Sequence, residues 1–196
     1  YWRIRWECLS SRALLKKIII PPCPYTRQEI DALVKNEKII MYVPPHITLS
    51  DLASIHPEIK SSYWSDFPDK NIKNDAHYGW MDIDSSPIPQ NTETSDQELE
   101  KTFKEKNRHG IHLLAYIIGA LDIHDRTGSW LDHIKIDYSN YPYIIPCRLL
   151  GSKHTLHKLP FVASFYPWGE LSFASYSARG DKSFFGARSI GQKKPS

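Results

Sequence analysis

The chain has 196 residues, a formal net charge of +3, 41% hydrophobic residues and 24% charged residues. This length favours one domain with its own core, and the composition excludes disordered, collagen-like and coiled-coil proteins. Three cysteines exclude a disulfide framework as the main source of stability, and no apolar run approaches the roughly 20 residues of a membrane helix. We therefore expect a folded cytoplasmic protein with no membrane segment.

Charge is distributed unevenly along the chain. Residues 1–24 carry a net charge of +4, residues 25–107 carry −6, and residues 145–196 carry +6. Basic segments of this kind are typical of proteins that bind phosphate groups or nucleic acid. The alternative is that the basic ends fold back on the acidic middle and neutralise it.

The first residues, YWRIRWECL, alternate between apolar and charged side chains, which predicts a strand with Trp2 and Trp6 on one face. Prolines between positions 21 and 24 then end any regular structure. We interpret residues 1–23 as an N-terminal arm, or as a translated segment upstream of the protein proper. Residues 24–191 are then a single domain, and residues 192–196 are a tail.

The start of a helix is marked by Ser or Thr followed three residues later by Glu, which forms a capping box. Such boxes are Thr26 with Glu29 and Ser95 with Glu98, and Thr48 caps a further short helix. Residues 38–43 and 78–84 predict strands, and residues 57–76 predict a long surface loop. Gly110 is expected to end or bend the helix that begins at Ser95.

The strongest core signal is a broad apolar face at helical spacing, which predicts a buried helix over residues 111–123. The chain after it is rich in strand signals. Residues 143–150 contain a proline and predict an edge strand or a broken strand, while residues 161–166 and 171–176 predict a β-hairpin. The residues after the hairpin are expected to cross the body as a loop and to end free. The predicted fold is an α+β single domain, with an antiparallel sheet packed against the buried helix 111–123.

Cationic side chains alternate with aromatic ones in the C-terminal third, as in nucleic-acid grooves. The cationic set is Arg148, Lys153, His154, His157, Lys158, Arg179, Lys182 and Arg188. We select Arg148, His154, Arg179 and Arg188 as the anion-binding candidates and expect the three arginines to converge beside the hairpin. Arginine offers a planar fork for phosphate, and the neighbouring glycines allow close backbone approach. The alternative is that the aromatics form the core and that the arginines are structural ties to acidic residues.

Acidic and imidazole side chains are densest in residues 122–137. His124, Asp125 and His133 are the candidates there for a divalent metal that activates water, which defines the alternative function of a metal-dependent hydrolase. The simpler interpretation is charged residues at a helix end and in a solvated loop. Two HxxH pairs, His109 with His112 and His154 with His157, lack the further ligands of a zinc site, so we interpret them as surface or core histidines. No dinucleotide, P-loop or hydrolase-elbow motif occurs, and we expect no cofactor.

Four segments, NTETSDQEL, RTGSWLD, CRLLGS and FFGARSIG, resemble in their order an uncharacterised family of bacterial hypothetical proteins from small-genome lineages. The resemblance covers about residues 24–191. It implies a small cytoplasmic protein and transfers no catalytic residue. Taken together, these features predict a binding protein that uses a basic, aromatic-rich C-terminal face on a polyanion such as nucleic acid.

Overall fold

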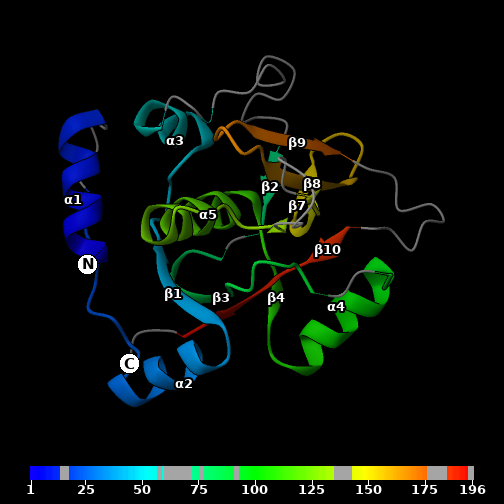
Figure 1. Cartoon of the computed structure of the whole chain (residues 1–196), viewed down its shortest axis with the longest axis horizontal. Coiled ribbons are helices and arrows are strands. Elements are labelled where there is room, and N and C mark those ends of the chain that lie inside the picture. The colour runs from blue at the N-terminus through cyan, green and yellow to red at the C-terminus, as the bar shows by residue number, and fades with distance from the viewer. Residues whose placement is uncertain are drawn as a thin grey trace.

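Helix α5 (Leu113–Thr127) lies at the centre of the molecule and packs against two β-sheets (Figure 1). The structure is a computed structural model that describes residues 1–13, 18–56, 59, 72–75, 77–90, 93–134, 143–175 and 185–193. In these residues the helices and the mostly antiparallel sheets form the predicted α+β fold. None of the helices described there has both the length and the apolar character needed to cross a bilayer.

The first sheet has the strand order β1 (Lys38–Val43), β3 (Gly79–Asp84), β11 (Ser189–Gln192) and β4 (His109–Gly110), and its pairs are antiparallel. Strand β11 lies between β3 and β4, so the prediction of a loop after the hairpin is wrong for residues 186–192. Ile190 of β11 is fully buried in the core, which gives this short segment its place in the sheet.

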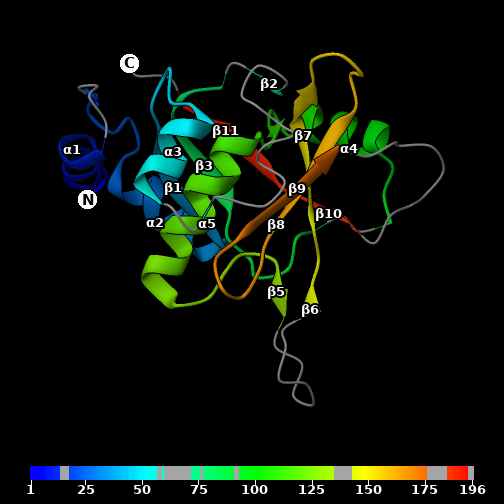
Figure 2. The ribbon, with the colours of Figure 1, turned by 90° about the horizontal axis from the view of Figure 1, so that it is seen from above.

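The second sheet contains the predicted hairpin, β8 (Pro160–Phe165) and β9 (Leu171–Ser175), which runs past α5 in Figure 2. Strand β7 (Cys147–His154) pairs with β8, with β2 (Ile72–Asn74) and, in parallel, with β10 (Gly186–Ala187). The predicted strand over residues 143–150 is broken, because β6 (Tyr143–Ile144) pairs instead with β5 (His133–Ile134). Of the two predicted alternatives, the broken strand is confirmed, with Pro146 in the break. Strand β7 is not an edge strand, because it pairs with β8 and also with β2 and β10.

The predicted central helix is confirmed, with its start shifted to Leu113. His112 is its N-cap, and Gly128 ends it in the left-handed conformation at φ 70°. Every side chain from Leu113 to Asp122 is buried. A Cβ on Gly119 would lie 2.2 Å from Cδ1 of Ile83, so this glycine allows the helix to approach the first sheet closely.

The predicted strand at the N-terminus is wrong, because residues Trp2–Ala13 form helix α1. Two tryptophans four positions apart share a face in a helix as well as in a strand, so the pattern alone does not distinguish the two. Both side chains are buried in the core. The indole of Trp2 donates to the Ile40 carbonyl oxygen at 2.9 Å, and that of Trp6 donates to the Tyr42 carbonyl oxygen at 3.1 Å. Helix α1 therefore covers the outer edge of β1.

Helices α2 (Arg27–Lys35), α3 (Leu49–Ile55) and α4 (Asp96–Glu105) all begin at capping boxes. Helix α4 ends before Gly110, which lies in β4, so Gly110 does not end the helix as predicted. Strand β2 occupies part of the predicted loop 57–76, most of which lies outside the described residues. The division into arm, domain and tail stays a prediction, although Trp2 and Trp6 belong to the same core cluster as α5 and both sheets.

Candidate functional site between α4, β4 and β7

Arg188, a predicted anion-binding residue, is 0% exposed and bound to protein acceptors. Its Nε donates to Asp132 Oδ1 at 3.1 Å, and its Nη2 donates to the same oxygen at 2.5 Å. The guanidinium also donates to the carbonyl oxygens of Asp84 and Ser86. Tyr116 donates to the other carboxylate oxygen of Asp132 at 2.7 Å. Arg188 is thus a structural tie, which is the alternative that the sequence left open.

Arg148 is also buried, with 2% of its surface exposed. Its Nη1 donates to Asp96 Oδ1 at 3.1 Å and to the Thr94 carbonyl oxygen, which fixes the start of α4 against β7. The residue opposite Arg148 in the β7–β10 ladder is Ala187, so the backbones of the two arginines are neighbours. Their side chains nevertheless bind different acids. Arg179 lies outside the described residues.

His154, the remaining anion-binding candidate, is buried at the end of β7. Its Nδ1 accepts from the backbone N–H groups of Leu156 and His157, both at 3.2 Å. The aromatic side chains of the hairpin strands, Phe161, Phe165 and Phe173, are buried in the core. His154 and these three phenylalanines therefore contribute to turn formation and packing.

The metal-site candidates are in separate contacts. The ring of His124 stacks on Trp130 at 3.9 Å, Asp125 Oδ2 lies 2.7 Å from Arg5 Nη2, and His133 Nε2 contacts the Phe165 carbonyl oxygen. Within the described residues, no three His, Cys, Asp or Glu side chains are arranged to hold a metal ion. Residues 135–137 of the proposed cluster lie outside this part of the chain.

An open cleft of about 340 Å³, lined by polar, charged and apolar residues, lies between α4, β4 and β7. Its volume is in the range of sites that take small molecules, roughly 300–1,000 Å³. Its walls come from three segments that are far apart in the sequence, around residue 75, over residues 100–110 and over residues 150–153. The lining residues are Asp75, Glu100, Phe103, Lys104, Asn107, Arg108, His109, Gly110, Leu150 and Lys153.

The cleft forms because the backbones of β4 and β7 pack directly against each other at two glycines, and α4 packs next to this contact. A Cβ on Gly151 would lie 2.6 Å from the Gly110 carbonyl oxygen, so only glycine fits at this crossing. Leu99 and Phe103 hold α4 against Leu150 in a small separate apolar cluster. The polar residues Glu100 and Lys104 of α4 then line the cleft.

Lysines provide mobile positive charge at the cleft. Lys153 of β7 lies directly opposite Lys73 of β2 in antiparallel register, and both are exposed. Like charges in this position destabilise a strand pair. Lys153 Nζ is 3.8 Å from Glu100 Oε1, and in the described part of the chain neither Lys73 nor Lys104 forms an ion pair. The cleft thus carries cations that the fold itself does not require.

Arg108, by contrast, is fixed and neutralised at the side of the cleft. Its Nη1 donates to Asp82 Oδ2 at 2.6 Å, and its Nε donates to Ser189 Oγ at 2.6 Å. A Cβ on Gly191 would lie 2.3 Å from Asp82 Oδ1, so a glycine is needed for this packing. Asp75 and Glu100 add carboxylate oxygens, so the cleft offers hydrogen-bond acceptors together with its lysines.

His109 lines the cleft, and a second imidazole, that of His77, packs against its ring. The rings of His77 and His109 stack with centroids 3.9 Å apart and planes at 27°. His77 Nδ1 also lies 3.4 Å from Gln192 Oε1. Burial is the largest cause that lowers the pKa of His109, and the His77 ring lowers it further, whereas Asp75 acts in the opposite direction.

His112, the partner of His109 in the HxxH pair, is a buried structural residue. Its Nδ1 accepts from the Ala115 backbone N–H at 3.3 Å, which caps α5, and its Nε2 lies 2.8 Å from the His77 carbonyl oxygen. Both contacts are satisfied by the neutral ring that carries its proton on Nε2. Burial lowers the pKa of His112 to about 4.

Acidification is therefore expected to destabilise the fold through His112. The unfolded histidine takes up a proton near its ordinary pKa of 6.5, whereas the folded one resists protonation until about 4. Its stabilising contribution is complete above pH 6.5 and falls by up to ~3 kcal/mol as the pH is lowered to about 4. Urea denaturation across this range measures it.

His112→Asn keeps an N-cap and removes the titration, so it should flatten this part of the pH dependence. His46→Asn is the matched control, because His46 is exposed and has φ 66°, a conformation that asparagine tolerates. Wild type and His112→Asn with parallel pH curves would contradict the assignment.

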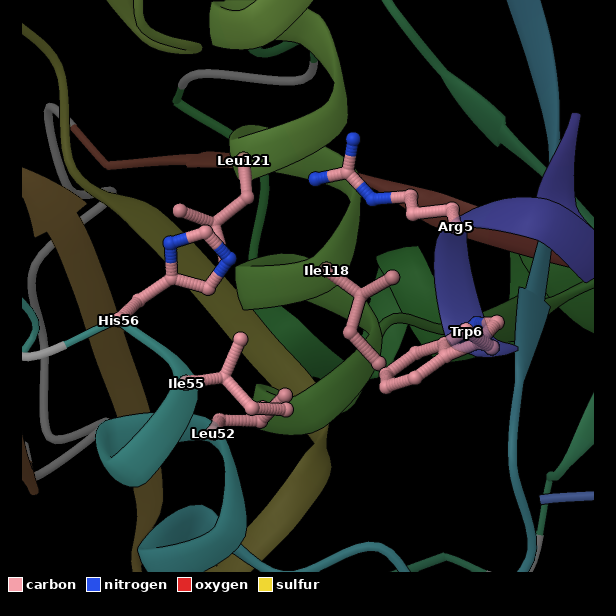
Figure 3. Close-up of a pocket in the computed structure, with 7 residues that line it drawn as sticks. All are labelled: Arg5, Trp6, Leu52, Ile55, His56, Ile118 and Leu121. Carbon is pink, nitrogen blue, oxygen red and sulfur yellow. The ribbon is translucent and has the colours of Figure 1, made fainter. Parts of the chain in front are cut away.

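A second hollow, between α1, α3 and α5, is too small for a ligand. It holds about 10 Å³ and is lined by Arg5, Trp6, Leu52, Ile55, His56, Ile118 and Leu121 (Figure 3). That volume is at most the room of one water molecule.

The sequence pattern included Lys153 among the cationic candidates but did not predict the cleft. Lys73 and Lys153, which lie opposite each other in the sheet, are 80 positions apart in the sequence. The one local sequence feature that marks this region is the HxxH pair of His109 and His112, because His109 lines the cleft. Comparisons of the chain with protein-family models, curated proteins and solved structures give no match. The resemblance to a bacterial family therefore stays a prediction.

Proposed function

We propose that this is a non-enzymatic binding protein of the cytoplasm that holds a single-stranded nucleic acid through the phosphate groups, at the cleft between α4, β4 and β7. The observation that carries the proposal is the cross-strand pair of Lys73 and Lys153. The pair costs stability in the free protein, and a bound phosphate would turn that cost into attraction. A cytoplasmic location suits the exposed thiols of Cys8 and Cys23, which stay reduced there.

The remaining lining residues suit a nucleotide better than a uniformly charged polymer. Asp75 and Glu100 repel phosphate but accept hydrogen bonds from the N–H groups of bases. Phe103 and Leu150 add apolar surface, and the His109 ring offers a flat face. A cleft of about 340 Å³ has room for roughly a nucleotide unit and not for a duplex, which supports a single strand as the ligand.

The test is binding of a fluorescently labelled oligothymidylate, followed by anisotropy. Lys153→Gln and Lys73→Gln are each expected to weaken binding about fivefold at low salt, because each removes about 1 kcal/mol of attraction to phosphate. Both variants should also lower the slope of affinity against salt concentration.

Lys35→Gln is the matched control, because Lys35 is an exposed lysine in the last turn of α2 and its loss changes the net charge equally. It should leave affinity nearly unchanged. The proposal is wrong if the wild-type protein does not bind the oligonucleotide at low salt, or if Lys35→Gln weakens binding as much as Lys153→Gln.

A further inference from the structure

We propose that the cleft takes up a proton together with its anionic ligand, and that the stacked imidazoles of His77 and His109 hold that proton. This inference rests on the proposed function and adds its regulation by pH. The proposed function depends on lysines, whereas this inference concerns histidines, the side chains whose charge changes near neutral pH.

The stacking disfavours a positive charge on both imidazoles at once. The ring centroids are 3.9 Å apart, and like charges at that distance repel each other. His109 lines the cleft itself, whereas His77 lies behind it against Gln192. A proton on His109 is thus placed where a bound phosphate would lie.

The groups around His109 act in two directions. Burial and the stacked His77 disfavour a positive charge on this ring. Asp75, which follows β2, favours it. Lys104 and Glu100 of α4 and Lys153 of β7 line the same cleft with charges of both signs.

The other neighbours contribute little to this balance. On the same segment, Arg108 is neutralised by Asp82. His112 stays neutral, because its Nδ1 accepts a backbone hydrogen bond inside the fold. Gln192 of β11 is uncharged and contacts His77 only through its side-chain oxygen.

A phosphate bound in the cleft lies beside His109 and adds attraction for a proton on its ring. Binding then raises proton affinity at His109, and by reciprocity protonation raises ligand affinity. Lowering the pH from about 8 to about 5.5 should tighten binding about fivefold, the effect of one added charge near 4 Å in a hydrated site.

The experiment measures oligothymidylate affinity by anisotropy at both pH values for wild type, His109→Gln and His77→Gln. The probe suits the test because its phosphodiesters and thymine bases do not change charge in this range. His109→Gln is expected to abolish most of the increase, and His46→Gln, at an exposed site outside the cleft, is expected to keep it. Calorimetry in two buffers of different ionisation enthalpy should show proton uptake by wild type and its loss in His109→Gln. Circular dichroism at each pH confirms that the variants are folded.

The outcomes separate this inference from the proposed function. If wild type binds, Lys153→Gln binds more weakly, and His109→Gln retains the full pH effect and proton uptake, the inference is overturned and the proposed function stands. If wild type binds at neither pH, both are wrong.

Discussion

Replacing Arg188 with methionine is expected to lower the free energy of unfolding by about 3–5 kcal/mol. The variant leaves Asp132 fully buried without its positive partner, and among the described residues only the Tyr116 hydroxyl still donates to its carboxylate. The carbonyl oxygens of Asp84 and Ser86 also lose a donor. Urea denaturation of wild type and variant measures the loss.

Arg27→Met is the matched control, because Arg27 pairs with Asp31 on the surface of α2, where the side chains are 87% and 53% exposed. Exposed pairs of this kind contribute about 0–1 kcal/mol. The double variant Arg188→Met with Asp132→Leu should recover much of the stability, because neither charge is then left buried and alone. Arg188→Met with wild-type stability and weakened oligonucleotide binding would restore the anion-binding role predicted from the sequence.

The features that sequence predicted well are local. The capping boxes at Thr26 and Ser95 involve residues three positions apart, so their hydrogen bonds do not depend on the tertiary structure. The apolar face of α5 is continuous over several turns, so its spacing fits a helix and does not fit the alternation of a strand. The β8–β9 hairpin needs only a turn between its two strands.

The features that sequence missed depend on distant partners. Residues 1–9 fit two periods, and packing of α1 against α3 and the edge of β1 decides for the helix. Strand β11 has four residues, too few for a pattern, and its place is set by β3 and β4. The candidate site has the same origin. Lys73 lies opposite Lys153 only after β2 pairs with β7, and Lys104 lines the same cleft as Lys153 only after α4 docks beside β7.

The arginines show why composition alone misleads about a binding face. A basic C-terminal third predicts a cationic surface, yet Arg148 and Arg188 each neutralise an acid from the middle of the chain, Asp96 and Asp132. These two arginines of the basic end are thus neutralised inside the fold, one of them by an acid of the segment 25–107. What remains for a ligand is a smaller set of exposed lysines.

Trp6→Ala is expected to destabilise the protein by about 3–5 kcal/mol. Trp6 is 2% exposed in the core cluster and lines the small hollow beside Ile118 (Figure 3). Truncation enlarges that hollow and leaves the Tyr42 carbonyl oxygen, at the edge of β1, without its indole donor. Thermal or urea denaturation measures the loss.

Trp168→Ala removes the same side chain from a turn where it is 64% exposed, so it should cost little. The comparison also tests how residues 1–23 relate to the domain. A large loss in Trp6→Ala alone means that α1 is part of the cooperative fold and protects the edge of β1 from pairing with other strands. Equal, small losses in both variants would mean that α1 does not contribute to stability, and residues 1–23 would then be the separate arm that the sequence predicts.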